Sequence, residues 1–404
     1  RAGAHFDGRC GSATHGSKPE MSYSYACELA SSSPYTGSKG FLVRKVDRSV
    51  TGLIAGQQCV GPLQLPVADC AVVAQSHFCT TGVASSIGEQ PIKMLINPKA
   101  GARMAVAEAL TNIAGANITK IEDIKCSLNW MWAPKLPGEG ALMYSAATAC
   151  RDAMVGVGMA VDGGKDSLSM ATKINGEMVK SPGEMTISTY APVLDITKKV
   201  TPDIKRAGKS KLLHVDISCG KRRLGGSALA QSFGEIGNEV PDINNIQILK
   251  NSFEAVQELV EDGRVLSIHD VGDGGIITTI SEMVMAGNCG ARVSLTGTDA
   301  VRDLFAEEAG WVIEYLPENE AEIWKVFKSK EHCPLLHVIG VTKAERKLNI
   351  IHDGKKVLSE DTHKLLTWWE ATSDALEEHQ MNIDLAREQA RNHARQGPKY
   401  KLTF

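Results

Sequence analysis

Residues 265–285 read VLSIHDVGDGGIITTISEMVM, and this stretch decides the fold class. Val265 to Ile268 predicts a short buried strand, and Ile276 to Met285 predicts an apolar helix. The glycine-rich segment His269 to Gly275 lies between them and is suited to a tight turn. A strand, a turn and a helix in this order form the unit from which α/β and α+β domains are built.

The same alternation of strand-like and helix-like segments continues on both sides of this stretch. Residues 102–114 predict a helix, because Val106, Leu110 and Ile113 fall on one face. Residues 142–157 predict a second helix, residues 212–218 a strand, and a further helix follows Ser227. The whole chain is therefore predicted to have a mixed α/β (α+β) fold.

The length of 404 residues corresponds to two or three domains. We expect residues 1–40, which are rich in Gly, Ser and Thr, to be a flexible arm or linker. Two domains of similar size are predicted over residues 41–205 and 206–370, and a charged helical tail over 371–404. Because the first residue is Arg rather than Met, we expect the chain to be part of a longer protein.

The composition excludes several classes of function. The chain has 44 basic and 47 acidic side chains and only 5% aromatic residues, which disfavours a nucleic-acid partner. Its ten cysteines include no CxxC pair, so neither a zinc site nor a disulfide scaffold is indicated. No apolar run approaches the ~20 residues that span a membrane, so we predict a cytosolic protein without a membrane partner.

Glycine-bearing loops are the first candidates for chemistry. Residues 56–61, 163–167, 222–227 and 269–275 each carry glycines that would let a phosphate approach the backbone, or would only make tight turns. The 163–167 segment is not a P-loop, because Met159 and Asp166 stand where that motif needs Gly and Ser or Thr. The basic run at Arg222 and Arg223 is either a phosphate cradle or a solvated turn.

Oxygen ligands for a hard cation are also present. Asp69 ends an apolar run, Glu108 and Asn112 share one helix face, and Asp270 follows a predicted strand. Carboxylate and amide oxygens suit Mg²⁺ bridged to nucleotide phosphates, although Glu108 and Asn112 alone most simply make a wet helix surface. His269 is interpreted as a structural hydrogen-bonding residue rather than a general base. Spacing alone does not bring the four oxygen ligands together.

A series of motifs in order resembles the phosphoribosylformylglycinamidine synthase family, in its large, single-chain, eukaryotic-like form. The resemblance covers residues 41 to the end and corresponds to the second half of the synthetase core. The motifs that carry it are Asp47–Leu53, Pro66–Asp69, Ala107–Asn112, Asn129–Ala133, Leu136–Gly140, Gly163–Met170, Arg223–Gln231, His269–Gly275 and Ala286–Gly290.

The resemblance implies a fold of two domains like the N-terminal and C-terminal domains of aminoimidazole ribonucleotide synthetase. It implies a carbon–nitrogen ligase of purine biosynthesis, which uses ATP and ammonia from glutamine to convert formylglycinamide ribonucleotide to formylglycinamidine ribonucleotide. The first synthetase half and the glutaminase domain, which would follow the tail, are absent from this chain. We therefore expect the chain alone not to complete the reaction.

The resemblance also assigns residues to sites. Asp69, Glu108, Asn112 and Asp270 match magnesium ligands of an auxiliary ATP or ADP site, and Ala68 and Gly272 match positions that contact the nucleotide. Gly272 departs from the family pattern, which usually has Ser there. Asn129, Gly164, Lys165 and Ser167 match positions near the substrate. No catalytic residue is assigned.

Two other interpretations stay open from the sequence. Besides contributing to the shared active site, the chain could be a structural scaffold that bound nucleotide stabilises. It could also be another member of the superfamily, such as aminoimidazole ribonucleotide synthetase. The face on which the 41–205 domain would meet the absent first half also predicts that the chain alone forms a homodimer.

Overall fold

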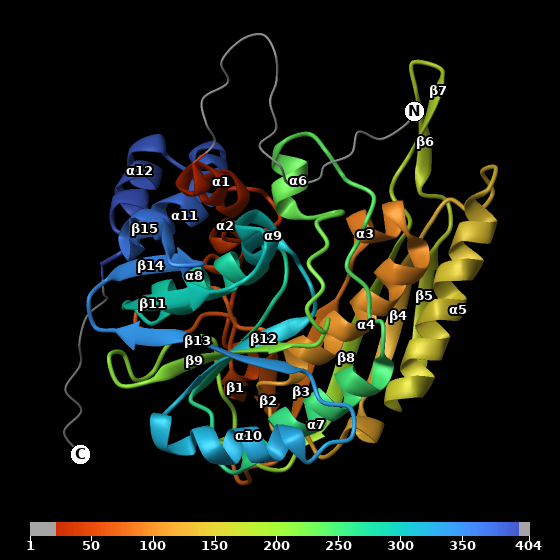
Figure 1. Cartoon of the computed structure of the whole chain (residues 1–404). Helices are drawn as coiled ribbons and strands as arrows, with labels where there is room; N and C mark the ends of the chain where they lie inside the picture. The colour runs from red at the N-terminus through yellow and green to blue at the C-terminus, as the bar shows by residue number, and fades with distance from the viewer. Residues whose placement is uncertain (1–21, 396–404) are drawn as a thin grey trace.

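Residues 22–395 are described by a computed structural model, in which two large mixed sheets lie side by side (Figure 1). The first sheet has the strand order β1-β2-β3-β8-β4-β5, and the second has the order β10-β12-β9-β13-β11-β14-β15. In this order, the strands of the first sheet span Ile54–Gly56, Ala71–Ala74, Gly82–Gly88, Glu184–Val193, Lys125–Met131 and Ala160–Ser167. In the order given for the second sheet, its strands span Ser267–Asp270, Gly310–Tyr315, Lys211–Asp216, Leu335–Lys343, Gly290–Leu295, Lys347–His352 and Lys355–Asp361. A separate hairpin pairs β6 (Ala171–Ile174) with β7 (Glu177–Lys180).

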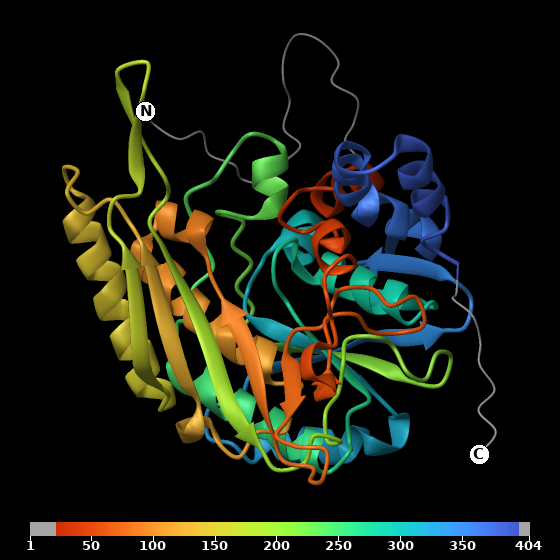
Figure 2. The ribbon, with the colours of Figure 1, turned by 180° about the vertical axis from the view of Figure 1, so that it is seen from behind.

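Helices α3 (Pro91–Ile96), α4 (Pro98–Ile113) and α5 (Glu139–Val157) cover one face of the first sheet. Helix α4 begins where the sequence provides a cap: Asn97 Oδ1 accepts hydrogen bonds from the next two available amides, and Pro98 occupies the first helical position. The predicted helix over 102–114 is confirmed, with its apolar residues buried. In the described part of the chain the opposite face of this sheet carries no helix (Figure 2).

The second sheet is covered by helices on both faces. Helices α7 (Ile246–Glu261) and α10 (Glu320–Lys328) lie on the side of the first sheet, where one core is shared by residues of both sheets. Helices α8 (Gly275–Ala286), α9 (Ala300–Phe305) and α11 (Thr362–Gln380) enclose a second core with α6 (Ala228–Ser232). The strand–turn–helix prediction for 265–285 is confirmed by β10 and α8. Because the two sheets share a core, side chains from both meet between them.

The expected flexible arm over residues 1–40 is wrong for the part that the structure describes. Helix α1 (Tyr23–Ser31) is capped by Ser22, whose Oγ accepts a hydrogen bond from Tyr25 N, and α2 (Gly40–Val43) follows. Ala26, Cys27 and Ala30 are buried in the second core. Small residues bury little area each, so their pattern was masked by the polar composition around them. The remainder of the predicted arm, residues 1–21, lies outside the described residues.

The charged tail is helical over its described part, as predicted. Helix α11 begins earlier than expected, at Thr362, and α12 (Ile383–Arg391) packs on it. Residues 396–404 lie outside the described residues. Every cysteine in residues 22–395 is a free thiol. Over the same residues, the structure has no helix with both the length and the apolar character needed to cross a membrane.

Candidate magnesium and nucleotide site

Six residues singled out in the sequence line two adjoining cavities, which share Asn112. One cavity, of about 210 Å³, is lined by Glu108, Asn112 and Asp270 together with Gly272. The other, of about 390 Å³, is lined by Ala68 and Asp69 and again by Asn112. Asp69 comes just before β2, Glu108 and Asn112 belong to α4, and Asp270 ends β10. Elements distant in the sequence thus deliver four oxygen-bearing side chains to one region.

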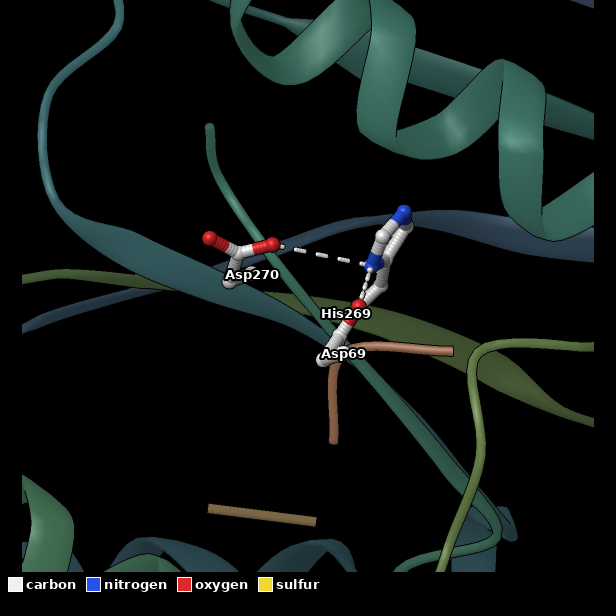
Figure 3. Close-up of side chains that lie close together, drawn as sticks. All are labelled: Asp69, His269 and Asp270. Carbon is white, nitrogen blue, oxygen red and sulfur yellow. Dashed lines mark ion pairs between the residues drawn. The ribbon is translucent and has the colours of Figure 1, made fainter. Parts of the chain in front are cut away.

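Asp69 and Asp270 both approach the ring of His269 (Figure 3). His269 Nδ1 lies 2.7 Å from Asp69 Oδ1, without the direction of a hydrogen bond, and 3.7 Å from Asp270 Oδ1. One ligand atom from each of the three residues lies within 4.8 Å of the others. On the other side of the ring, Nε2 is 2.8 Å from Glu282 Oε2, and Trp369 Nε1 donates to Glu282 Oε1 at 2.9 Å. His269 is therefore hydrogen-bonded at Nε2 and lies beside a carboxylate at Nδ1.

The carboxylates of the site carry more negative charge than the protein neutralises. Burial, reinforced by the charge of Asp69, raises the pKa of Asp270 to about 7. Burial and then the charges of Asp273 and Asp270 raise the pKa of Glu108 well above its ordinary value. For His269, burial acts to lower the pKa, but the attraction of Asp69 and Glu282 raises it overall. A divalent cation would relieve this excess charge, so the donor set fits Mg²⁺.

Glu108 and Asn112 are oriented by hydrogen bonds rather than left on a wet helix surface. Glu108 Oε2 accepts from Glu89 N at 2.7 Å and from Gln90 Nε2 at 3.0 Å. Asn112 Nδ2 donates to Ile87 O at 2.8 Å, which leaves the amide oxygen available to a ligand. The helix face that sequence reasoning treated as solvated is a wall of the cavity.

Sequence reasoning missed the contribution of residues 35–39. Tyr35 and Thr36 line the cavity, and Lys39 Nζ donates to Gly37 O at 2.7 Å. Burial lowers the pKa of Lys39, although the charges of Glu282 and Asp273 oppose this. The run Gly37-Ser38-Lys39-Gly40 resembles the other glycine-bearing loops and could have flagged this segment.

Two protein-family models match the chain in succession. The model described as the FGAR-AT PurM_N-like domain matches residues 38–192. The model described as the AIR synthase related protein, C-terminal domain, matches residues 211–353. These matches confirm the two-domain fold expected from the resemblance.

Curated relatives agree with these matches. The chain is 48% identical over 377 residues to "Probable phosphoribosylformylglycinamidine synthase, chloroplastic/mitochondrial" of Arabidopsis thaliana, an alignment covering 92% of the chain and 26% of that relative. It is 45% identical over 389 residues to "Phosphoribosylformylglycinamidine synthase" of Homo sapiens, covering 95% and 29% respectively. The chain belongs to the phosphoribosylformylglycinamidine synthase family. It spans little more than a quarter of the length of these two synthases.

Solved structures show the same fold. "T. maritima PurL complexed with FGAR" superposes with a TM-score of 0.66 at 16% identity, over 86% of this chain and 54% of that one. "T. maritima PurL complexed with ATP" gives a TM-score of 0.62 at 15% identity, over 85% and 52%. At this level of identity the likeness concerns the fold.

The residues that the synthase resemblance placed near substrate lie together, but apart from the magnesium candidates. Asn129 on β4 pairs with Lys165 on β5, and Gly164 and Ser167 occupy neighbouring positions of the same pair of strands. The 163–167 segment is thus part of an edge strand rather than a loop. In the sheet order, β5 is four strands from β2, which follows Asp69. That separation is roughly 19 Å at about 4.8 Å per strand. None of the four residues lines either cavity, although β8, which supplies Ser188 and Thr189 to the larger cavity, pairs with β4.

The basic loop at Arg222 and Arg223 is neither a free phosphate cradle nor a solvated turn. Arg223 forms a bidentate pair with Glu308, with both N–O distances 2.7 Å. Arg222 Nη1 lies 2.8 Å from Asp216 Oδ2, and its Nε lies 3.3 Å from Asp303 Oδ1. Both arginines form ion pairs with carboxylates of the same chain, so the loop has a structural role.

A buried histidine beside this loop predicts acid sensitivity. Burial lowers the pKa of His214 from 6.5 to about 4; the charge of Asp216 opposes the shift, and Arg222 and His337 add to it. Below pH 6.5 the unfolded chain binds a proton that the folded protein refuses, so stability falls as the pH drops toward 4. Between about pH 7.5 and about pH 5, we expect His214 to lower the free energy of unfolding by about 2 kcal/mol. The midpoint of urea unfolding measures this loss.

His214→Asn should reduce this pH dependence while leaving the contribution of Asp216 in place. Equal pH dependence in the variant and the parent protein would contradict the assignment. His363→Asn is a matched control, because His363 is a histidine that lies near the surface.

Proposed function

We propose that this chain binds a magnesium nucleotide, ATP or ADP, at these two adjoining cavities. Asp69, Glu108, Asn112 and Asp270 would hold the cation, and Ala68 and Gly272 would contact the nucleotide. The observation that carries the proposal is the convergence of these side chains on two adjoining cavities. Magnesium, when bound there, would neutralise the phosphate oxygens of the nucleotide.

We further propose that the chain is the second half of the synthetase core of a larger enzyme. That enzyme would convert formylglycinamide ribonucleotide, ATP and glutamine to formylglycinamidine ribonucleotide, ADP, phosphate and glutamate. Asn129, Gly164, Lys165 and Ser167 would contribute to an active site shared with the first half. Asn129 Oδ1 is buried without a hydrogen-bond partner, which supports a role in contacting an external group.

The open face of the first sheet supports a partner at that surface. Val73, Val83, Ile87 and Tyr190 are large apolar side chains exposed by more than a third on its strands. Apolar side chains gathered on an uncovered sheet face are typical of an interface. The proposed occupant is the first synthetase half, and in its absence a second copy of the chain; a glutaminase domain would complete the enzyme. A cytosolic location is proposed on the composition alone.

The nucleotide site admits a catalytic and a scaffold role. The absence of Asn129, Gly164, Lys165 and Ser167 from the lining of both cavities favours a scaffold role. In the full-length enzyme, Asn112→Ala would separate the two: reduced folding with normal turnover per folded molecule indicates a scaffold.

Calorimetric titration with Mg·ADP tests the proposal on the chain as it stands. We expect binding that EDTA abolishes, and we expect Asp69→Asn to weaken it at least ~10-fold, because a carboxylate ligand of the cation is lost. Asp152→Asn is the matched control, since Asp152 is exposed on α5 and, within residues 22–395, pairs only with its neighbour Arg151. Unchanged affinity in Asp69→Asn, or no binding by the parent chain, would refute the proposed site.

A further inference from the structure

One buried carboxylate, Glu307, collects hydrogen bonds from three separate segments. Its side chain is 1% exposed. Oε2 accepts from Lys93 Nζ at 2.7 Å, while Oε1 accepts from the amides of Gly274 and Ala228, each at 2.7 Å. All three donors are therefore satisfied by a residue that lies between α9 and β12 and does not line the larger cavities.

The three donors belong to separate elements, one of which borders the proposed nucleotide site. Lys93 is on α3, which covers the first sheet, and its side chain is only 3% exposed. Gly274 precedes α8 and ends the loop that begins after Asp270, whereas Ala228 begins α6. Glu307 thus connects the layer of the first sheet with two loops of the second domain.

The loop held by Glu307 has backbone dihedral angles that residues other than glycine rarely adopt. Gly274 and Gly275 have φ values of 86° and 74°, in the left-handed region that favours glycine. Val271 N donates to Gly310 O at 2.9 Å, so the loop is fixed at its start by β12 and at its end by Glu307. Between these two points lie Gly272 and Asp273, which line the cavity.

The ion pair also shares a small void with two proposed magnesium ligands. This void, of about 10 Å³, is lined by Lys93 and Glu307 and also by Glu108, Asp270 and Gly272. That volume is about the space of one water molecule. Lys93 Nζ is in addition 3.7 Å from Asp273 Oδ1, so its charge acts on the loop directly.

We propose that Lys93 and Glu307 are positioning residues, which lock the loop of residues 271–275 in the conformation that accepts the nucleotide. The lock joins the two domains, because one partner comes from α3 and the other from the second domain. A buried ion pair is a poor source of net stability, but it fixes geometry, since each charge is costly without the other. This inference rests on the proposed magnesium–nucleotide site.

The test compares Lys93→Met, Glu307→Gln and the double variant. Each single variant leaves one buried charge without its partner and should be less stable. The double variant has neither charge, so its urea midpoint should recover toward that of the parent protein. If Lys93 and Glu307 had a purely structural role, the double variant would recover Mg·ADP affinity together with stability.

The lock instead predicts that affinity stays about 10-fold lower in the double variant, the loss expected if the loop holds its accepting conformation for about a tenth of the time. Deuterium exchange of the peptide covering residues 271–275 should be faster in the same variant without ligand. Lys211→Met, which breaks a partly exposed pair with Glu320, is the control and should change neither readout.

The outcomes separate this inference from the proposed function. If the parent chain binds Mg·ADP and the double variant binds it equally well with unchanged exchange, the lock is refuted and the site stands. If the parent chain does not bind Mg·ADP, the proposed site fails, and unchanged exchange in the ligand-free double variant still refutes the lock.

Discussion

Gly61→Ala is expected to destabilise the protein by about 3 kcal/mol or more, from left-handed strain and overpacking together. Gly61 has a φ of +73°, and a Cβ built on it would lie 2.0 Å from Ala286 O at the end of α8. Its neighbours Val60 and Leu65 belong to the second core. The added methyl group must therefore displace backbone rather than a side chain, which the urea midpoint will measure.

Gly263→Ala separates the two contributions to this loss. Gly263 has a φ of +64°, but a Cβ there would meet nothing within 4 Å. Its substitution should cost only about 1 kcal/mol, the strain of a left-handed alanine. Equal losses in Gly61→Ala and Gly263→Ala would show that the contact with Ala286 does not matter.

Trp311→Ala is the second large expected effect, a loss of about 3–5 kcal/mol in the free energy of unfolding. Trp311 lies on β12 and is fully buried in the core that both sheets share. Its Nε1 donates at 3.0 Å to Thr111 O, in the last turn of α4, and this carbonyl also accepts a longer bond of 3.4 Å from Ala114 N. The substitution thus leaves a cavity between the two domains and removes the shorter of these two hydrogen bonds.

Trp311→Phe retains a ring and isolates the loss of the hydrogen bond, which should cost about 1–3 kcal/mol. Trp324→Ala is the control, because Trp324 is only partly buried on α10, with Lys328 Nζ 4.9 Å from its ring centroid. Urea unfolding followed by circular dichroism measures all three variants. A loss in Trp311→Ala no greater than that in Trp324→Ala would contradict the proposed role in joining the domains.

The local elements of the fold were predictable because their signals lie within short windows. The apolar face of α4 and the glycine turn between β10 and α8 are visible at the spacing of neighbouring residues. The segment of residues 163–167 was misjudged because its two glycines indicate a turn, whereas pairing with β4 holds it as a strand. Pairing with a strand distant in sequence cannot be read from the segment itself.

The candidate site was predictable in its residues but not in its surroundings. The motif resemblance selected Asp69, Glu108, Asn112 and Asp270, and the structure brings them to adjoining cavities. Spacing alone could not, because the four come from separate elements whose approach depends on how the two sheets pack. No sequence pattern indicated a role for Glu307, because that role depends on three donors distant in the sequence.

Helix α1 has a practical consequence for anyone choosing expression boundaries. A shortened chain that begins at residue 41 would uncover the apolar surface on α6 and α11 that α1 contacts. Newly bared apolar surface promotes self-association, so such a protein should aggregate more readily than the longer one. It would also lack Tyr35 and Thr36, so weak nucleotide binding by that product would reflect a missing wall rather than defective ligands.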